Sequence, residues 1–303
     1  MSGFEQLQER VVELKEKLNA IIVAHNYQRP EVQDIADITG DSLELARKCV
    51  GTRAKTIVFC GVRFMAETAA ILNPSSMVLL SHPDAGCPLA DMINVEKLKQ
   101  WKQKYPRAAV VAYVNTTAAI KAESDFCCTS ANGVEVVSAV PDEEVLFIPD
   151  RNLGHYVSTK TKKKMILYPG FCYVHDRITA EQVKLAKRHY PQARVLVHPE
   201  CRPEVINLAN AALSTSQMLR YAKQSDGEVF LIGTEEGILH PLRKQNPEKE
   251  FHIIASNFIC TDMKKTTLET LFETMQTRSN VVTVPEEIRV RAKQAIGKML
   301  AIT

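Results

Sequence analysis

The sequence predicts an α/β fold built from three homologous units, each a small parallel sheet with helices on both faces. Two observations support this class. Short apolar runs rich in Val and Ile alternate with segments of helical period, and similar words recur about every 85–90 residues. Near-continuous apolar strands between helices are typical of parallel sheets buried on both faces. We therefore expect three three-layer αβα units around a pseudo-threefold axis, with the active site at the centre.

The individual elements follow from the period of the apolar residues. The first is an amphipathic helix, in which Phe4, Leu7, Val11, Leu14 and Leu18 fall at helical spacing. Strands are predicted at 19–25, 55–61, 77–82, 108–115, 144–150, 165–170, 193–200, 228–233 and 250–256. The last segment contains PEEIRVRAKQAIGKML, which has a Pro-led acidic first turn and a helical apolar stripe, so we expect a closing helix.

An internal repeat sets the expected unit boundaries. HNYQRPEVQDIAD begins at His25 and HPECRPEVINLAN begins at His198, 173 residues later, with Arg-Pro-Glu-Val in the same register. A weaker middle copy ends at Asp125, opposite Asp37. These matches predict a first domain with the N-terminal helix at 1–105, a second at 106–191, a third at 192–275 and the closing segment at 276–303.

Composition narrows the function classes. The 303 residues are 45% hydrophobic and 24% charged, which is ordinary for a globular protein. The formal net charge is only +3, and no dense basic run carries interleaved aromatics, so we expect no nucleic-acid partner. No apolar run reaches the roughly 18–20 residues that span a bilayer, and the N-terminus lacks an apolar signal core. We expect a cytoplasmic protein without a membrane partner.

Eight cysteines in a reducing compartment are expected to be metal ligands, catalytic groups or buried thiols rather than disulfides. Cys87, Cys172 and Cys260 lie 85 and 88 residues apart, each in a loop that follows an apolar run. If each belongs to one unit, the three thiols can converge and hold an iron–sulfur cluster. A 4Fe–4S cluster normally takes four thiolates, so three would leave one iron open to a substrate.

Two rival interpretations of these cysteines stay open at this point. Zinc held by three cysteines and one histidine would form a closed structural site. Cys201, beside Glu200, is a rival ligand or nucleophile. The remaining cysteines lie in helix or strand runs and are expected to be buried: Cys49, Cys60, Cys127 and Cys128.

Polar pairs lie at the carboxyl end of the first predicted strand of each unit. The pairs are His25 with Tyr27, Tyr113 with Asn115, and His198 with Glu200. Right-handed crossovers bring the carboxyl ends of parallel strands to one edge of a sheet, and residues two apart in an extended segment point the same way. A His–carboxylate pair that faces a cavity is suited to proton transfer near neutral pH. The pairs therefore predict acid/base groups at the shared edge.

A small hydroxyl residue follows each copy of the repeat, at Ser42, Ser130 and Thr215. These residues could be helix N-caps, where Ser and Thr are preferred. They could also mark helix N-termini that bind a carboxylate or phosphate through free N–H groups. Three such ends around one cavity would suit a small polyanionic substrate.

Longer words point to one family. They are HNYQRPEVQDIAD, GDSLELAR, FMAETAAILNP, YVNTTAAIKA, TSANGVEVV, PDRNLGHYV, CYVHDRIT, HPEC, STSQM, GTEEGILHPLRK and CTDMKKTTLE. In these words, which run essentially end to end and in family order, the chain resembles the quinolinate synthases. The resemblance implies three homologous α/β domains around a central active site and one 4Fe–4S cluster per chain, with Cys87, Cys172 and Cys260 as ligands.

The same resemblance implies a reaction. Iminosuccinate (iminoaspartate) condenses with dihydroxyacetone phosphate to give quinolinate, phosphate and water in de novo NAD (pyridine nucleotide) biosynthesis. An aspartate oxidase or dehydrogenase would supply the iminosuccinate. The open iron would act as a Lewis acid. We expect Glu200 with His198 to carry out general acid/base chemistry and Tyr27 to be a second proton carrier.

Substrate-binding positions carried over from the resemblance are His25, Ser42, Tyr113, Val114, Asn115, Ser130, His175, His198, Pro199, Glu200 and Thr215. Two words depart from the family pattern. Gln217 stands where Gly is expected, and Thr261-Asp262 stands where Pro-Asn or Ile-Gly is commoner. The first could alter the loop after Thr215, and the second could alter the surroundings of the cluster.

Two other function classes are weighed against this one. A cluster-dependent hydro-lyase acting on a small dicarboxylic acid would share the open iron but would need no triose phosphate. An iron–sulfur redox sensor would need a partner surface, such as a basic patch for DNA. The near-neutral charge and the strand-end pairs count against the sensor.

Overall fold

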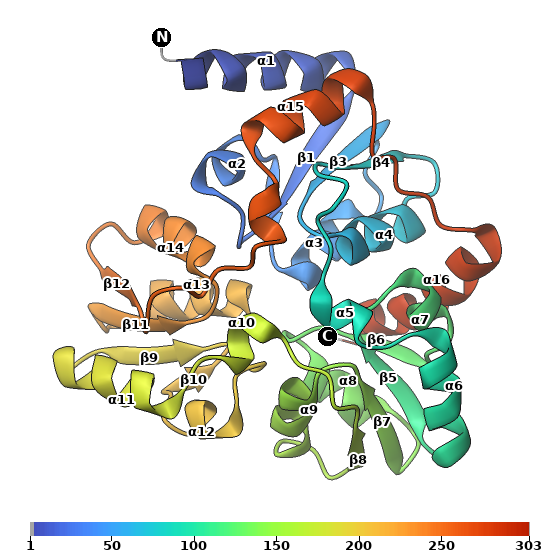
Figure 1. Ribbon diagram of the computed structural model, residues 1–303, viewed down its shortest axis with the longest axis vertical. Helices are drawn as coiled ribbons and strands as arrows, with labels where there is room; N and C mark the ends of the chain where they lie inside the picture. Colours follow the sequence, from blue (N-terminus) through green and yellow to red (C-terminus); the bar gives the residue numbers. More distant parts are fainter. Residues whose placement is uncertain (1–2, 303) are drawn as a thin grey trace.

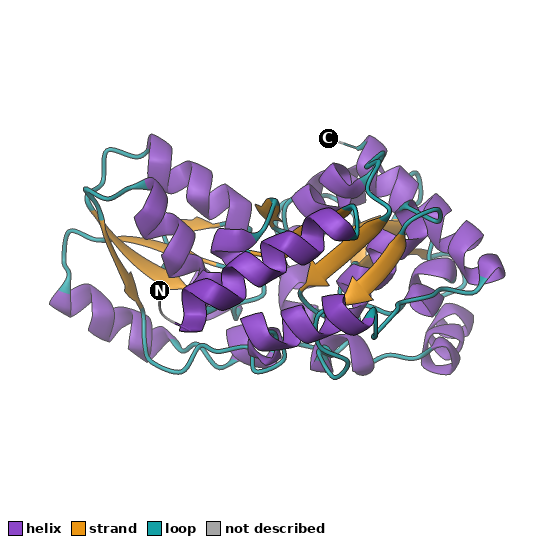
Figure 2. Cartoon of the chain, turned by 90° about the horizontal axis from the view of Figure 1, so that it is seen from above, coloured by secondary structure: helices purple, strands orange, loops and turns teal. Residues whose placement is uncertain are grey.

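The computed structural model describes residues 3–302, and it contains three four-stranded parallel sheets. Helices cover both faces of each sheet, and the three units lie around a common centre (Figures 1 and 2). The predicted α/β class with three αβα units is therefore confirmed. Each sheet places the first strand of its unit second in the order, so the three topologies are the same: β2-β1-β3-β4, β6-β5-β7-β8 and β10-β9-β11-β12.

The first unit begins with a helix and then alternates strands and helices. Its elements are α1 (Gly3–Lys17), β1 (Ala20–His25), α2 (Pro30–Ile35), β2 (Ile38–Gly40), α3 (Ser42–Cys49), β3 (Thr56–Cys60), α4 (Arg63–Leu72), β4 (Met77–Leu80), α5 (Pro88–Asp91) and α6 (Val95–Lys104). The strands are almost entirely buried, as expected for a sheet covered on both faces.

The second unit repeats this order. Its elements are β5 (Ala109–Tyr113), α7 (Ala118–Ala122), β6 (Phe126–Cys128), α8 (Gly133–Ala139), β7 (Glu144–Ile148), α9 (Arg151–Ser158), β8 (Lys164–Leu167), α10 (Tyr173–Asp176) and α11 (Ala180–His189).

The third unit and the closing segment complete the chain. They contain β9 (Arg194–Val197), α12 (Pro203–Ile206), β10 (Ala211–Ala212), α13 (Thr215–Gln224), β11 (Val229–Gly233), η1 (Glu236–Ile238), α14 (Leu239–Gln245), β12 (Glu250–Ile253), η2 (Met263–Lys265), α15 (Leu268–Thr277) and α16 (Glu286–Ala301).

All nine predicted strands are present, but the second strand of each unit, β2, β6 or β10, was not predicted. These strands have only three, three and two residues and lie at a sheet edge. Runs this short carry no periodic signal. They form because the neighbouring strand offers unpaired backbone groups.

One hydrogen bond recurs in all three units and shows that the repeat is structural. A side-chain oxygen near the start of the second strand accepts the backbone N–H of the second or third residue of the first strand. The acceptors are Asp37, Asp125 and Asn210, and the donors are Ile22, Val110 and Val195, at 2.8, 2.8 and 2.7 Å. The predicted alignment of Asp125 with Asp37 is therefore confirmed.

The chain returns to the earlier units at its end. Helix α15 packs on α1, where Val11, Leu268 and Met275 share one buried cluster (Figure 1). The predicted closing helix is present as α16, which packs on α7 and β6 of the second unit.

The side chain of Phe4 lies outside the described residues. The boundaries at 105/106, 191/192 and 275/276 stay predictions. Helix α15 packs on the first unit although most of it lies in the predicted third range.

No helix between residues 3 and 302 is long and apolar enough to cross a bilayer.

Candidate active site

The carboxyl ends of the strands meet at one central cavity. Thirteen of the fifteen residues predicted for the site line it: His25, Tyr27, Ser42, Cys87, Tyr113, Asn115, Ser130, Cys172, His175, His198, Glu200, Thr215 and Cys260. The other two do not. Val114 lines a small adjoining cavity between α3 and α4, and Pro199 is buried beside the site. The roles of all fifteen stay predictions.

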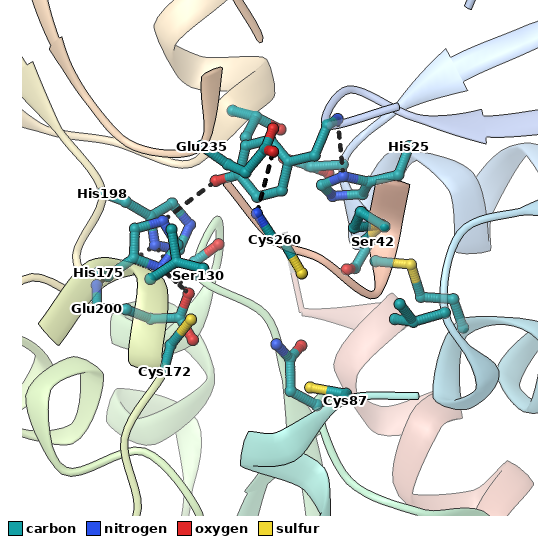
Figure 3. Close-up of a pocket in the computed structure, with 18 of the residues that line it drawn as sticks. His25, Ser42, Cys87, Ser130, Cys172, His175, His198, Glu200, Glu235 and Cys260 are labelled. Atoms are coloured by element: carbon teal, nitrogen blue, oxygen red, sulfur yellow. Dashed lines mark hydrogen bonds and ion pairs between the residues drawn. The ribbon is translucent and has the colours of Figure 1, made fainter. Parts of the chain in front are cut away.

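The three loop cysteines come from equivalent places. Cys87 and Cys172 immediately precede α5 and α10, and Cys260 lies between β12 and η2. Figure 3 shows their sulfur atoms around the same cavity. Burial raises the pKa of all three thiols, so a thiolate at any of them needs a compensating cation. Three soft ligands that need a cation fit an iron–sulfur cluster.

The other cysteines lie elsewhere. Cys49, Cys60, Cys127 and Cys128 are buried, as predicted. Cys201 is also buried, its Sγ lies 3.5 Å from the carbonyl oxygen of Gly233, and it is not among the residues that line the central cavity.

One carboxylate oxygen of Glu200 contacts two imidazoles. Its Oε2 is 3.1 Å from Nδ1 of His175 and 3.0 Å from Nδ1 of His198, and the two rings stack with centroids 4.4 Å apart (Figure 3). Burial alone would raise the pKa of Glu200, but the hydrogen bonds and charges of the two histidines outweigh it and lower the pKa to about 2. Glu200 is therefore a carboxylate at neutral pH that orients two imidazoles.

A hydroxyl pair extends this cluster. The Tyr27 hydroxyl makes a short hydrogen bond with Oγ1 of Thr234, which lies 2.8 Å from Nε2 of His175. Burial raises the pKa of Tyr27 well above its ordinary value, so Tyr27 is a neutral phenol. The chain of contacts from Tyr27 through Thr234 and His175 to Glu200 joins residues of all three units. Sequence reasoning missed Thr234, although it lies in the quoted word GTEEGILHPLRK.

His25 has a different environment from His198. Its Nδ1 accepts the backbone N–H of Tyr27 at 3.1 Å, so the ring proton of the neutral form sits on Nε2. Burial lowers the pKa of His25 to about 4, against the opposing charge of Asp41. His25 is therefore a neutral N–H donor in the cavity wall.

The hydroxyl residues are not the helix caps. Asp41 caps α3 and Ser214 caps α13, while Ser42 and Thr215 are the first helical residues. Ser130 lies three residues before the start of α8. The N-cap interpretation is therefore wrong. The helix N-terminus interpretation remains for Ser42 and Thr215, because both lie in the first turn and line the cavity.

Two acceptor oxygens of the cavity residues have no hydrogen-bond partner within the described chain. They are Oδ1 of Asn115 and Oε1 of Glu200, and both are buried. Buried acceptors are normally satisfied, so both atoms are available to a ligand. Among residues 3–302, no lysine or arginine lines this cavity, so an anionic ligand would be bound by N–H and O–H donors.

Comparison with known proteins identifies one family. A family model described as "Quinolinate synthetase A protein" matches residues 9–301. The chain is 55% identical over 296 residues to a quinolinate synthase of Methanoregula boonei, covering 98% of both chains. It is 52% identical over 298 residues to one of Dehalococcoides mccartyi, covering 98% of this chain and 99% of the relative. Identity to the Thermodesulfovibrio yellowstonii protein of that name is 51% over 295 residues, covering 97% of both.

Proposed function

The chain belongs to the quinolinate synthase family and is an enzyme of this type, and from that premise we propose the chemistry at its centre. The enzyme condenses iminosuccinate with dihydroxyacetone phosphate to form quinolinate, phosphate and water in NAD biosynthesis. The observation that carries the proposal is the meeting of three equivalent loop cysteines and the Glu200 cluster at one cavity. We place the reaction in the cytoplasm, with iminosuccinate supplied by an aspartate oxidase or dehydrogenase.

We assign one 4Fe–4S cluster per chain to Cys87, Cys172 and Cys260. No further cysteine within residues 3–302 lines the cavity, so a cluster held there has three protein thiolates. When bound, the cluster supplies Lewis acidity toward a substrate hydroxyl or carboxylate through its open iron.

Substrate binding is assigned to donors from all three units. The hydroxyls of Ser42, Ser130 and Thr215 and the first-turn N–H groups of α3 and α13 bind the carboxylates of iminosuccinate. One helix end contributes only about 0.3–1 kcal/mol, so several must act together. Nε2–H of His25 adds a neutral donor, while Tyr113 and Asn115 orient the intermediate.

Proton transfer is assigned to the cluster of side chains around Glu200. Because Glu200 stays ionised, the protons move on the imidazoles of His198 and His175, which the carboxylate orients. Tyr27 exchanges its hydroxyl proton with this group through Thr234. These groups serve the imine closure and the dehydration that aromatise the ring.

The experiment is a product assay on anaerobically purified protein. We expect about four irons per chain and quinolinate, detected by mass spectrometry, only when both iminosuccinate and dihydroxyacetone phosphate are present. Turnover of a dicarboxylic acid without the triose phosphate would favour the hydro-lyase instead. One zinc and no iron per chain would overturn the cluster assignment.

A further inference from the structure

In two of the three cysteine loops, the backbone N–H of the cysteine donates to a buried carboxyl group that has no role in the proposed reaction. Asp150 follows β7, caps α9 and is fully buried. Its Oδ1 accepts the backbone N–H groups of Asn152 and Leu153 at 2.9 and 2.8 Å. Its Oδ2 accepts the backbone N–H of Cys172 at 3.0 Å. The carboxylate thus ties a cysteine loop to the end of a central strand.

Glu235 repeats the arrangement in the third unit. It follows β11, caps η1 and is fully buried. Oε1 accepts the backbone N–H of Cys260 at 3.1 Å, and Oε2 accepts that of Gly237 at 2.7 Å (Figure 3). Nζ of Lys264 lies 3.0 Å from Oε1 and provides a counter-charge.

The first unit has the same backbone frame without the acid. In each unit, one backbone hydrogen bond joins the first residue of the helix after the third strand to the residue two positions before the cysteine. The bonds are Arg63 N–H to Ala85 O, Arg151 N–H to Gly170 O and Glu236 N–H to Phe258 O, at 2.8, 2.8 and 3.0 Å. The residue before each donor is Val62, Asp150 or Glu235. The side chain of Val62 has no acceptor atom for an N–H of the Cys87 loop.

A carboxylate from the third unit reaches that loop instead. Asp262, two residues after Cys260, accepts the backbone N–H of Gly86 at 3.3 Å. Nζ of Lys265 lies 2.8 Å from the Asp262 carboxylate and also donates to the carbonyl of Asp84 at 2.6 Å. Asp262 therefore joins the Cys87 loop to the Cys260 loop. It belongs to the pair Thr261-Asp262, one of the two places where the sequence differs from the expected family pattern.

We infer that Asp150, Glu235 and Asp262 are positioning residues, each of which holds the backbone beside one cluster ligand. This inference rests on the proposed cluster at Cys87, Cys172 and Cys260. Hydrogen bonds to a carboxylate are stronger than neutral ones, and partners behind a ligand fix its orientation. Asp262 makes the site depend on contact between two units.

Amide hydrogen exchange of the cluster-free protein tests the positioning without any cluster. Asp150→Asn should speed exchange in segment 170–173 on the order of tenfold and leave segment 258–262 unchanged. Glu235→Gln should do the reverse, and Asp262→Ala should act on segment 84–87. Asp125→Asn is the matched control, because Asp125 also accepts a backbone N–H, from Val110, but near the amino end of β5. If Asp150→Asn does not fold, Asp150→Ser keeps a cap for α9 but is too short to reach Cys172.

Iron release from protein that contains the cluster is a second measurement. All three variants should release iron to a chelator roughly tenfold faster. Asp125→Asn should release iron at the rate of the unaltered protein. Unchanged exchange at the matching loop, or equal loosening of all three loops in every variant, would overturn the inference. Absence of iron in the unaltered protein would instead overturn the proposed cluster, and the exchange result would still stand.

Discussion

The first and third units place a histidine at the same point of the fold and surround it differently. In both, Nδ1 of the histidine faces the backbone N–H two residues later, at 3.1 Å for His25 and 3.4 Å for His198. In the first unit that later residue is Tyr27, and in the third it is Glu200. One repeated backbone therefore supports a neutral donor in one unit and a carboxylate–imidazole cluster in another.

The repeated units share one backbone arrangement, and different side chains at equivalent positions give each unit different chemical properties. His25 has its pKa lowered to about 4 by burial, so it suits binding. Burial also lowers the pKa of His198, but the Glu200 carboxylate opposes that shift and contacts the ring, which suits the proposed proton transfer. The cysteine loops, in contrast, have the same proposed role in every unit, which is to supply one cluster ligand.

The largest effect should come from the feature that the units share. Cys87→Ser, Cys172→Ser and Cys260→Ser should each abolish the cluster and the quinolinate activity, because the proposed cluster has three thiolate ligands and none is spare. Iron content and visible absorption of anaerobic protein are the measurements. Cys201→Ser is the control and should keep the cluster. Retention of full iron content by any one of the three variants would mean that the units are not equivalent at the cluster.

The contact chain between the units should have the next largest effect. Tyr27→Phe removes the hydroxyl that meets Thr234, so the first unit loses its link to the His175–Glu200 cluster. We expect kcat to fall about 100-fold with the cluster intact, since a positioned proton carrier typically contributes that much. Steady-state kinetics with iron analysis is the measurement. If only KM changes, Tyr27 belongs with His25 as a binding residue.

The buried histidine of the first unit leads to a pH prediction. The unfolded chain protonates His25 below pH 6.5, whereas the folded chain holds its pKa at about 4. The stabilisation is therefore full above pH 6.5 and is lost as the pH falls toward 4. The loss should reach about 3 kcal/mol. Chemical denaturation of cluster-free protein between about pH 7 and pH 4 measures it.

Glu200 of the third unit should affect the stability of the protein in a lower pH range than His25. The lowered pKa of Glu200 stabilises the fold above pH 4.5, and that stabilisation is lost only as the pH falls toward 2. Because Glu200 titrates at lower pH, His25→Asn should reduce the pH dependence of the free energy of unfolding between pH 6.5 and 4. His198, whose pKa burial also lowers, should account for a residual slope. An unaltered slope in His25→Asn would show that His25 is not buried in its neutral form.

The smallest effect concerns a residue that departs from the family pattern. Oε1 of Gln217 accepts the Ser214 N–H at 2.8 Å, and its Nε2 donates to the carbonyl of Ala131 in the second unit at 3.1 Å. Gln217→Ala should cost about 1 kcal/mol of stability and raise KM about threefold with kcat unchanged, because the cavity edges at Ser130 and Thr215 loosen.

A matched variant separates the two bonds of Gln217. Gln182→Ala removes the equivalent capping bond to Thr179 in α11 without a bond to another unit. It should lower the melting temperature of the protein similarly and leave KM unchanged. Equal KM values in both variants would assign Gln217 to helix capping alone.

The sequence predicted the fold class, nine strands and the meeting of the loop cysteines, because apolar period and repeat spacing are local or nearly local signals. It did not predict β2, β6 and β10, which are too short to carry a period and depend on the neighbouring strand. Thr234 and Asp150 were missed for a similar reason. Their importance comes from contacts with His175 and Cys172, which lie far from them along the chain.

The central claim is that the His198–Glu200 pair of the third unit moves protons and that the repeated His25 position does not. The direct test compares kcat, KM and iron content of Glu200→Gln and His25→Gln, each assayed with iminosuccinate and dihydroxyacetone phosphate. We predict that both keep the cluster, that Glu200→Gln lowers kcat by about 1000-fold, and that His25→Gln mainly raises KM. Near-normal kcat in Glu200→Gln, with iron content unchanged, would contradict the account.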